Sequence, residues 1–473
     1  MPRSPLLATS ALLGVVLCAA AMPGAVSAQA KPAARHAMPA PKALSIPYTI
    51  DTLANGLTLI VHEDHSVPVV AVNTWYHVGS ADEETGRTGL AHLFEHLMFM
   101  GSEHAQYPMF DRLLEAAGAD NNATTNEDRT AYFENGPANA LPLMLWLDAD
   151  RMGWLLPTMD SAKVDLQRDV VKNERRQSVE NQPYGKAWDA IPPLVFPAEH
   201  PYSWPVIGSM ADLSAASLED VKNFFRKFYA PNNATLVISG DVNAAAVLAQ
   251  VKKYFGEIPH GPPITRRPTP TFTTTHDTSV VLTDRVQLPR VYDVWHSTRA
   301  YGPDDAALNL LAYILTGAKN GRLTEPLVYV RQLAADVNAF QDGRLRDGQF
   351  GIIATARPGH TLTELQVVID SQVARLVADG PTPRELEQAK NSFESATLKQ
   401  LEYGSAIADQ LNSYYYFTGD PDYLAKDLAR TRAVTAADIQ RVAHAYLQVP
   451  RVVVSVVPEG KPELAARAAE VGR

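Results

Sequence analysis

The stretch LAHLFEHLMF, residues 90–99, combines the pattern of a buried helix with two histidines and a glutamate. At about 100° per residue, the large apolar residues of this stretch share one face of a helix: Leu90, Leu93, Phe94 and Leu97. His92, Glu95 and His96 fall on the opposite face. The pattern therefore predicts a helix with one core face and one face that carries a site.

Two histidines four positions apart lie over one turn of a helix, so both imidazoles can bind the same metal ion. Glu95 lies between His92 and His96 and projects close enough to contact a water molecule at that metal. The competing interpretation is a solvated helix face that carries two histidines without a metal. A third ligand elsewhere in the chain would favour the metal site.

The best candidate for a third ligand is Glu174, within KVDLQRDVVKNERRQSVEN at 163–181. On a helix, Glu174 lies in the middle of an arc with apolar flanks: Val164, Leu166, Val170 and Val171. A carboxylate on a buried face needs a partner, which could be a metal or an ordinary salt bridge. His62 and His65 in VHEDH are typical of a charged loop, and His200 is typical of a turn, so we do not expect them to be ligands.

The composition limits the class of protein. The chain has 473 residues, is 46% hydrophobic and 20% charged, and carries a formal net charge of -10 at pH 7. It is long enough for two or more domains. No block of lysine and arginine with interleaved aromatic residues is present, so we expect no nucleic-acid partner. Since the only cysteine is Cys18, a zinc site must use histidine and carboxylate ligands.

Residues 1–28 resemble a secretory signal peptide, with Arg3, an apolar run at 6–22 and the small residues 26–28 before the cleavage site. An uncleaved membrane anchor is the alternative. A flexible leader follows at 29–45, and no later segment is long and apolar enough to span a bilayer. We therefore expect a periplasmic or secreted protein whose mature chain has no stable membrane span.

The remaining chain predicts two similar domains. A hairpin signal at Asn55-Gly56 opens the first domain, 46–257. The proline-rich segment IPHGPPITRRPTPTF, 258–272, predicts a linker, which the second domain, 273–460, and a C-terminal tail, 461–473, follow. LEDVKNFFRKFYAPNNATLVISGDV from 218 and AADIQRVAHAYLQVPRVVVSVVPEG from 436 each combine a helix, a tyrosine and a strand. We expect an α+β fold in which each domain has a mainly antiparallel sheet with helices packed on it.

The motif His-x-x-Glu-His and the distal glutamate in RDVVKNERR resemble those of the inverted-zincin metallopeptidases, the family of pitrilysin, insulysin and the mitochondrial processing peptidases. Further matches are NNATTNEDRTAYFENGP (121–137), HPYSWPVIGS (200–209) and FYAPNNATLVISGDV (228–242). The resemblance covers most of residues 45–460, with specific motifs in the first half and general organisation in the second.

The resemblance implies one zinc ion per chain, bound by His92, His96 and Glu174, and a general base, Glu95, that takes a proton as water attacks a peptide carbonyl. In the family a substrate strand docks along a sheet edge, which corresponds here to Asn122, Ala123 and Thr124. The two halves of the family fold enclose a chamber, which implies oligopeptides or unfolded segments as substrates.

The chain departs from the family pattern at two places. Gln167 stands where the family often has a glutamate, so we expect it beside the ligands with a hydrogen-bonding group but no charge. Active single-chain relatives also carry an arginine and, seven residues later, a tyrosine, and Val328 and Ala335 stand at those positions. Neither can donate a side-chain hydrogen bond to a developing oxyanion. Arg331 is nearby, but the alignment of this segment with the family does not favour it as the missing arginine.

The chain therefore resembles the metal-bearing subunit of two-chain members. The sequence predicts a zinc endopeptidase, or its catalytic subunit, that acts as a homodimer or with a paralogous partner supplying the arginine and tyrosine. A non-catalytic binding or assembly protein that retains a zinc site is the alternative, although such a site has no need of Glu95. A zinc hydrolase of other substrates is a third hypothesis, and an exposed sheet edge facing the metal would favour peptides.

Overall fold

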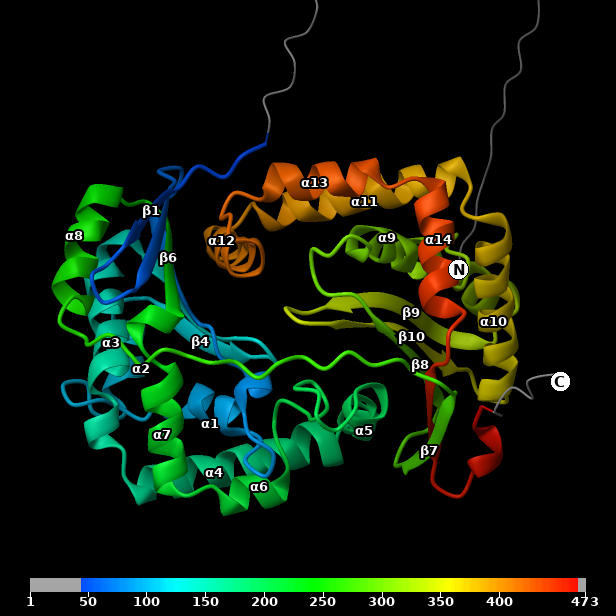
Figure 1. Ribbon diagram of the computed structural model, residues 1–473, viewed down its shortest axis with the longest axis horizontal. Coiled ribbons are helices and arrows are strands. Elements are labelled where there is room, and N and C mark those ends of the chain that lie inside the picture. Colours follow the sequence, from blue (N-terminus) through cyan, green and yellow to red (C-terminus); the bar gives the residue numbers. More distant parts are fainter. Residues whose placement is uncertain (1–43, 467–473) are drawn as a thin grey trace, which may run out of the picture. The chain divides into compact units, whose positions relative to one another are not determined.

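Two β-sheets organise the part of the chain that the computed structural model describes, residues 44–466 (Figure 1). The predicted signal peptide at 1–28, nearly all of the leader at 29–45 and the end of the tail lie outside the described residues. The strands of the first sheet are β1 (Thr49–Thr52), β2 (Thr58–Glu63), β3 (Val69–Tyr76), β4 (Asp120–Thr125), β5 (Thr130–Pro137) and β6 (Ala234–Gly240). Those of the second are β7 (Thr278–Asp284), β8 (Arg290–Ser297), β9 (Ala334–Gly343), β10 (Gly348–Ala356) and β11 (Val452–Pro458).

The two sheets share one topology. The order of hydrogen-bonded strands is β1-β2-β6-β3-β5-β4 in the first sheet and β7-β11-β8-β10-β9 in the second. One pair in each sheet is parallel, β2 with β6 and β7 with β11, and the others are antiparallel. Without β1, each strand of the first sheet has a counterpart at the same place in the second, with β2 matching β7 and β6 matching β11. The predicted α+β fold of two similar domains is therefore confirmed.

The sequence signals for individual elements agree with this topology. The turn at Asn55-Gly56 joins the antiparallel strands β1 and β2, and Gly56 adopts φ 90°, which a residue with a Cβ rarely does. The two similar segments that start at 218 and 436 form α7 (Leu218–Phe228) with β6 and α14 (Ala436–Leu447) with β11. Each pair places its strand at the same position in its sheet.

The helices of the first half precede residue 256. They are α1 (Leu90–Leu97), α2 (Met109–Ala116), α3 (Leu141–Trp154), α4 (Ser161–Arg175), α5 (Gly185–Val195), α6 (Met210–Ala215), α7 and α8 (Ala244–Phe255). Those of the second half are α9 (Asp305–Thr316), α10 (Leu362–Asp379), α11 (Pro383–Gln400), α12 (Gly404–Thr418), α13 (Leu424–Ala433) and α14. None of the described helices is long and apolar enough to cross a membrane.

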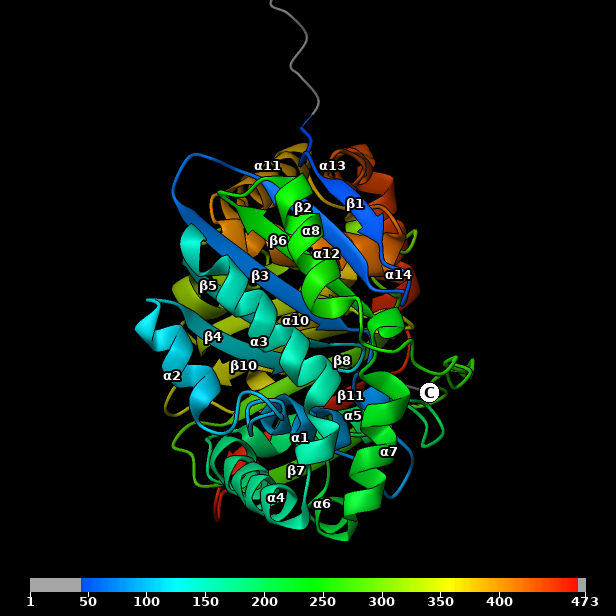
Figure 2. The same ribbon diagram turned by 90° about the vertical axis from the view of Figure 1, so that its left-hand side faces the viewer.

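Each sheet has helices of its own half on one face. Figure 2 shows α3 and α8 lying over the first sheet, where Leu145 and Val247 pack on strand residues such as Val72. In the second half, Leu311 of α9 and Leu365 of α10 pack against the other sheet. Burial of these apolar side chains is the main stabilising term for each half.

The second face of each sheet is covered by a helix from the other half. Ile407 and Leu411 of α12 pack on Ile60 and Val237 of the first sheet. In return, α5 packs its apolar face, including Ile191, on β8 and β11 of the second sheet. Residues 256–277, which include the predicted linker, form no helix or strand between the two halves. The cores of the halves are therefore joined by exchanged helices.

Candidate metal centre

Helix α1 is fixed at its start by a buried carboxylate. Glu83 is 1% exposed, and its two carboxylate oxygens accept hydrogen bonds from the backbone N–H groups of Gly89 at 3.0 Å and Ala91 at 2.8 Å. These groups have no partner within the helix, so Glu83 satisfies them. Burial raises the pKa of the Glu83 carboxyl to about 8. Gly89 adopts φ 92°, which lets the chain turn sharply into α1.

The structure brings His92, His96 and Glu174 together. The Nε2 atom of His92 lies 3.6 Å from Oε1 of Glu174, and Nε2 of His96 lies 3.2 Å from Oε2. One ligand atom from each residue lies within 4.8 Å of the others, and no other such group of three His, Cys, Asp or Glu residues occurs between residues 44 and 466. His92 is buried, whereas His96 and Glu174 are half-buried.

The donor set fits zinc. Zinc bonds to histidine nitrogen and carboxylate oxygen are about 2.0–2.2 Å long, so a tetrahedral ion holds its ligand atoms about 3.3–3.5 Å apart. The nitrogens of His92 and His96 lie 3.6 and 3.2 Å from the two oxygens of Glu174, which is close to this range. Burial lowers the pKa of His92, which favours the neutral imidazole that can bind a metal. A hydrogen bond from His96 lowers the pKa of Glu174 and favours its carboxylate form.

Glu174 lies on α4, which packs against α1. Asp160 caps α4 by accepting a hydrogen bond from the N–H of Lys163 at 2.9 Å. Val164 and Val171 are buried as predicted, but Leu166 and Val170 are 52% and 39% exposed. The prediction of a wide apolar arc was wrong for these two residues, because α4 meets the core along a narrow stripe and leaves its flanks in solvent.

Arg175, which no sequence pattern predicted as functional, anchors the chain directly after Glu174. Its guanidinium donates to the backbone oxygen of Gly208 at 2.9 Å and to Oδ2 of Asp189 at 2.7 Å. The helix then continues as a π-helical turn, Arg176–Glu180, a distortion that is frequent at functional sites. These contacts fix the end of α4 that carries Glu174. No sequence signal identified Arg175, because its two partners lie in other segments.

Glu95 is joined to the first sheet by one side-chain contact. The hydroxyl of Thr125, the last residue of β4, donates a hydrogen bond of 2.6 Å to Oε2 of Glu95. Thr125 is a second residue that the sequence analysis missed. Its alternation with the exposed Thr124 along the strand could have placed it on the α1 side of the sheet.

Asn122, Ala123 and Thr124 lie on β4, which is the edge strand of the first sheet. Asn122 and Thr124 are exposed, and Ala123 is 5% exposed and packs in the core beside α1. The side-chain oxygen of Asn122 accepts a hydrogen bond from the N–H of Ala123 at 2.8 Å. Because β4 contacts both β5 and α1 and ends at Thr125, the exposed sheet edge lies next to α1 and Glu95.

The hydrogen bond of Gln167 does not involve the triad, and neither do the elements that hold Val328, Ala335 and Arg331. The Nε2 of Gln167 contacts Sδ of Met100 at 2.8 Å rather than a member of the triad. Val328 belongs to a π-helical turn, Glu325–Val330, and Ala335 belongs to β9. Arg331 lines a separate surface cavity of about 680 Å³ beside α10 and α11.

The prediction that His62 and His65 lie in a charged loop is wrong for His62. His62 lies in β2, is 8% exposed, and its Nδ1 is 2.7 Å from the backbone oxygen of Pro47. Its neighbours in sequence are charged, but the parallel pairing of β2 with β6 buries it. His200 lies in a turn, as expected, and accepts a hydrogen bond at Nδ1 from the N–H of Tyr202 at 3.0 Å.

Comparison with family descriptions gives two matches. Residues 58–189 match the family described as "Insulinase (Peptidase family M16)", and residues 215–393 match "Peptidase M16 inactive domain". The first match contains the triad and the second covers most of the second sheet. Together they extend over more than half of the chain.

Curated proteins and solved structures agree with these matches. The chain is 29% identical over 404 residues to "Zinc protease PqqE" of Helicobacter pylori, covering 84% of this chain and 89% of that relative. It is 25% identical over 427 residues to a probable mitochondrial-processing peptidase subunit beta of Arabidopsis thaliana, covering 88% and 79%. A crystal structure of a protease from Helicobacter pylori superposes with a TM-score of 0.81 at 27% identity, covering 88% of this chain and all of that one. A peptidase M16 inactive domain from Pseudomonas fluorescens has a TM-score of 0.79 at 19% identity, covers 89% of this chain and 98% of its own, and shows the fold alone.

Proposed function

Because the chain belongs to the insulinase (M16) family of peptidases, we propose that it is a zinc-dependent endopeptidase, or the catalytic subunit of one, with the triad of His92, His96 and Glu174 as its zinc site. The donor types and separations of the triad support one zinc ion per chain. Zinc in such a site supplies a Lewis acid that lowers the pKa of water toward about 7. Three protein ligands leave a position open for that chemistry.

Glu95 is proposed as the general base. Its Oε2 accepts the hydrogen bond from Thr125, which leaves Oε1 to take a proton from the attacking water. The same residue can then pass that proton to the leaving amine. Thr125 fixes the orientation of the carboxylate and so acts as a positioning residue.

Peptides are proposed as substrates because β4 is an edge strand. An extended peptide can add to the free edge at Asn122–Thr124 through backbone hydrogen bonds, which are independent of its sequence. Since Thr125 at the end of that edge contacts Glu95, a peptide bond on the docked strand lies beside the base. This adjacency of edge strand, base and triad is the observation that carries the proposal. It favours peptides over the other hydrolase substrates.

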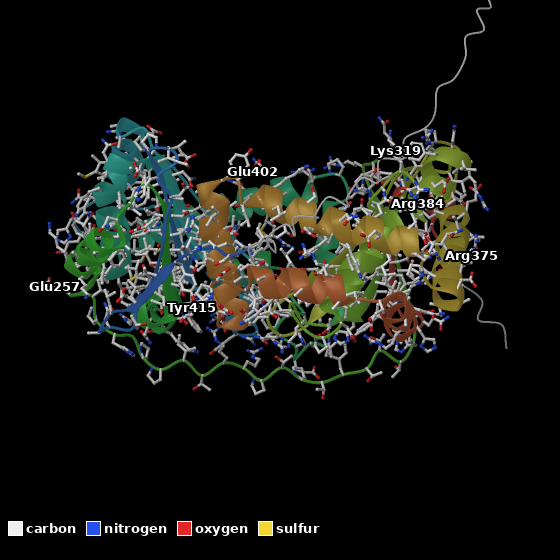
Figure 3. The ribbon with its side chains drawn as sticks, turned by 90° about the horizontal axis from the view of Figure 1, so that it is seen from above. Glu257, Lys319, Arg375, Arg384, Glu402 and Tyr415 are labelled. Carbon is white, nitrogen blue, oxygen red and sulfur yellow. The ribbon has the colours of Figure 1, made fainter. Side chains whose placement is uncertain are left out.

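The test compares the intact chain with Glu95→Gln. We expect the variant to keep its zinc, because the three ligands remain, and to lose hydrolysis of a quenched fluorescent peptide library by roughly three orders of magnitude or more. Glu257→Gln is the matched control, because Glu257 is exposed and lies just after α8 at the edge of the molecule (Figure 3). Undiminished turnover of Glu95→Gln would remove Glu95 from the mechanism.

The alternative function is non-catalytic binding or assembly. The name of the family that matches residues 215–393, an inactive domain, supports it, as do the apolar residues Val328 and Ala335. A bound zinc with no cleavage of any peptide by the intact chain would favour this alternative. The Glu95–Thr125 contact argues against it, since a structural zinc site needs no base.

We further propose a periplasmic or secreted location and a two-subunit enzyme. One structural neighbour is a periplasmic protease from Escherichia coli, and one relative is named as a subunit. A second copy of the chain, or a paralogous partner that supplies an arginine and a tyrosine, would complete the site. Assaying the isolated chain at several concentrations, alone and with a paralogue that lacks the metal motif, tests this. Full activity of a monomer would contradict the idea.

A further inference from the structure

A cavity of about 350 Å³ lies between the first sheet and the start of α12. It reaches β4 through Thr124, and none of the three triad residues lines it. Its walls come from both halves of the chain: Asn73, Thr124, Arg129 and Phe133 from the first half, and Ser405 and Asp409 from α12.

The strand register puts these residues on one face of the sheet. Asn73 pairs with Phe133, and Phe133 pairs with Asn122. Because directly paired residues point to the same face, Asn122 and Thr124 face the cavity side, whereas Ala123 and Thr125 face α1. A peptide docked on the free edge of β4 would therefore point every second side chain toward this cavity and the others toward the triad side.

The distance to the cavity selects for long side chains. Neighbouring strands are about 4.8 Å apart, so the rim at Thr124 lies one strand away from a docked peptide. Alanine, serine and valine side chains are too short to cross β4 from there. Phe133 provides an aromatic surface inside the cavity, which favours another aromatic ring.

The charges in the cavity oppose a fully charged occupant. The guanidinium of Arg129 donates from Nη1 to the backbone oxygen and Oγ1 of Thr124, at 2.7 and 2.6 Å, and its buried Nε has no hydrogen-bond partner. On the α12 side, Oδ1 of Asp409 accepts a hydrogen bond from Nε1 of Trp75 at 3.3 Å. Arg129 and Asp409 carry opposite charges and interact with one another, so an acidic or basic occupant would find no unpaired counter-ion. A neutral group that both donates and accepts suits the pair.

We propose that this cavity is a specificity subsite that binds a tyrosine side chain of a peptide docked on β4, with Phe133 contacting the ring and Arg129 and Asp409 contacting the hydroxyl. This inference rests on the proposed peptidase function. It assigns to the second half, through α12, a direct part in choosing the substrate. We expect the preference for tyrosine at one position of the peptide. Because the cavity is partly open to solvent, tyrosine is preferred there but not required.

The test uses a set of quenched fluorescent peptides in which tyrosine is moved through each position of an otherwise alanine-rich sequence. We expect one position at which tyrosine raises kcat/KM by about tenfold over alanine, with phenylalanine between them and glutamate and arginine below phenylalanine. Ser405→Trp fills the cavity from an exposed position in the first turn of α12, so the fold is preserved. It should remove the tyrosine advantage, so that kcat/KM for the tyrosine peptide falls to the value for the alanine peptide in the same variant.

Glu402→Trp is the matched control, because Glu402 is exposed beyond the start of α12, at the end opposite Tyr415 (Figure 3), and does not line the cavity. It should change kcat/KM for neither the tyrosine peptide nor the alanine peptide. An undiminished tyrosine advantage in Ser405→Trp, or no position that favours tyrosine, would overturn the subsite. If no peptide is cleaved, the proposed function fails, and fluorescence anisotropy of labelled tyrosine and alanine peptides still tests the cavity. Equal dissociation constants would then overturn it.

Discussion

Thr125 holds Glu95 through a single hydrogen bond of 2.6 Å. Thr125→Val has nearly the same shape and removes only the hydroxyl, so the carboxylate would rotate between several orientations. We expect kcat to fall by about tenfold with little change in KM or zinc content, since the base is misaligned while the ligands and the sheet edge remain. Steady-state kinetics with metal analysis measures this. Thr125→Ser should restore most of the activity, and failure of that rescue would contradict the positioning role.

Glu174 is the one proposed ligand that does not lie on α1. Glu174→Gln replaces a carboxylate by a neutral amide of the same size, which is a much weaker zinc ligand. We expect zinc affinity to fall by at least about a hundredfold, measured by competition with a chelator of known affinity. Glu180→Gln, an exposed glutamate in the π-helical turn that follows α4, is the control. Wild-type affinity in Glu174→Gln would mean that the third ligand is another residue.

The proximity of His92 and His96 could be predicted because helical spacing is a local property. Glu174 could be selected because a carboxylate on an apolar helix face needs a partner. Thr125 and Arg175 could not be found in this way, because their partners depend on how β4 and α4 pack against other segments. For the same reason the burial of Leu166 and Val170 was predicted wrongly, since helical periodicity does not give the width of the contact with the core.

The loop between β9 and β10 anchors the turn that follows β4. Arg344 forms ion pairs with Oε1 of Glu127 at 3.0 Å and Oδ2 of Asp342 at 2.7 Å. Next to it, the N–H of Leu345 donates to Oδ2 of Asp128 at 2.9 Å. Glu127 and Asp128 directly follow the strand whose end contacts Glu95. A hairpin of the second half therefore holds the strand that the proposed site uses.

Removing one partner of this half-buried network should be costly. We expect Arg344→Gln to lower the free energy of unfolding by about 1.5 kcal/mol, because Glu127 and Asp342, which are partly solvated, lose their common counter-ion. Glu127→Gln should lower the free energy of unfolding less in the Arg344→Gln background than in the wild type. Urea unfolding of the four proteins of this double-mutant cycle measures the difference. Arg384→Gln, on the exposed side of α11 (Figure 3), is the control. Additive effects of the two substitutions would contradict the coupling.

The strands and the repeat could be read from local patterns such as Asn55-Gly56 and the two helix–strand segments. The exchange of α5 and α12 could not. Ile407 and Leu411 show that α12 has an apolar face, but periodicity gives the face and not the sheet that covers it. Which sheet an apolar helix face covers depends on the topology of the whole molecule. Covering either sheet would remove a similar apolar area from water, so the sequence of the helix does not choose between them.

His77 lies where α12 meets the first sheet, and it makes this contact sensitive to acid. Its ring stacks on Tyr416 of α12 with a centroid distance of 4.4 Å, and its Nε2 lies 3.0 Å from Oγ1 of Thr235 in β6. Burial, with a smaller effect from the nearby Arg266, lowers the pKa of His77 from 6.5 to about 3. Between these two values the unfolded chain binds a proton at this histidine and the folded chain does not, so stability falls as the pH falls.

A pH of 5 lies about 1.5 units below the pKa of histidine in the unfolded chain. Protonation of His77 in the unfolded chain therefore lowers the free energy of unfolding at pH 5 by about 2 kcal/mol. Urea unfolding at pH 7 and pH 5 should therefore show a smaller loss in His77→Gln than in the wild type, because glutamine keeps a polar contact and cannot take up the proton. His444→Gln, at an exposed position on α14, should lose as much as the wild type. An equal loss in wild type and His77→Gln would show that the contact between α12 and the sheet does not titrate. A smaller loss in the variant would establish that acid weakens the contact through which the second half covers the first sheet.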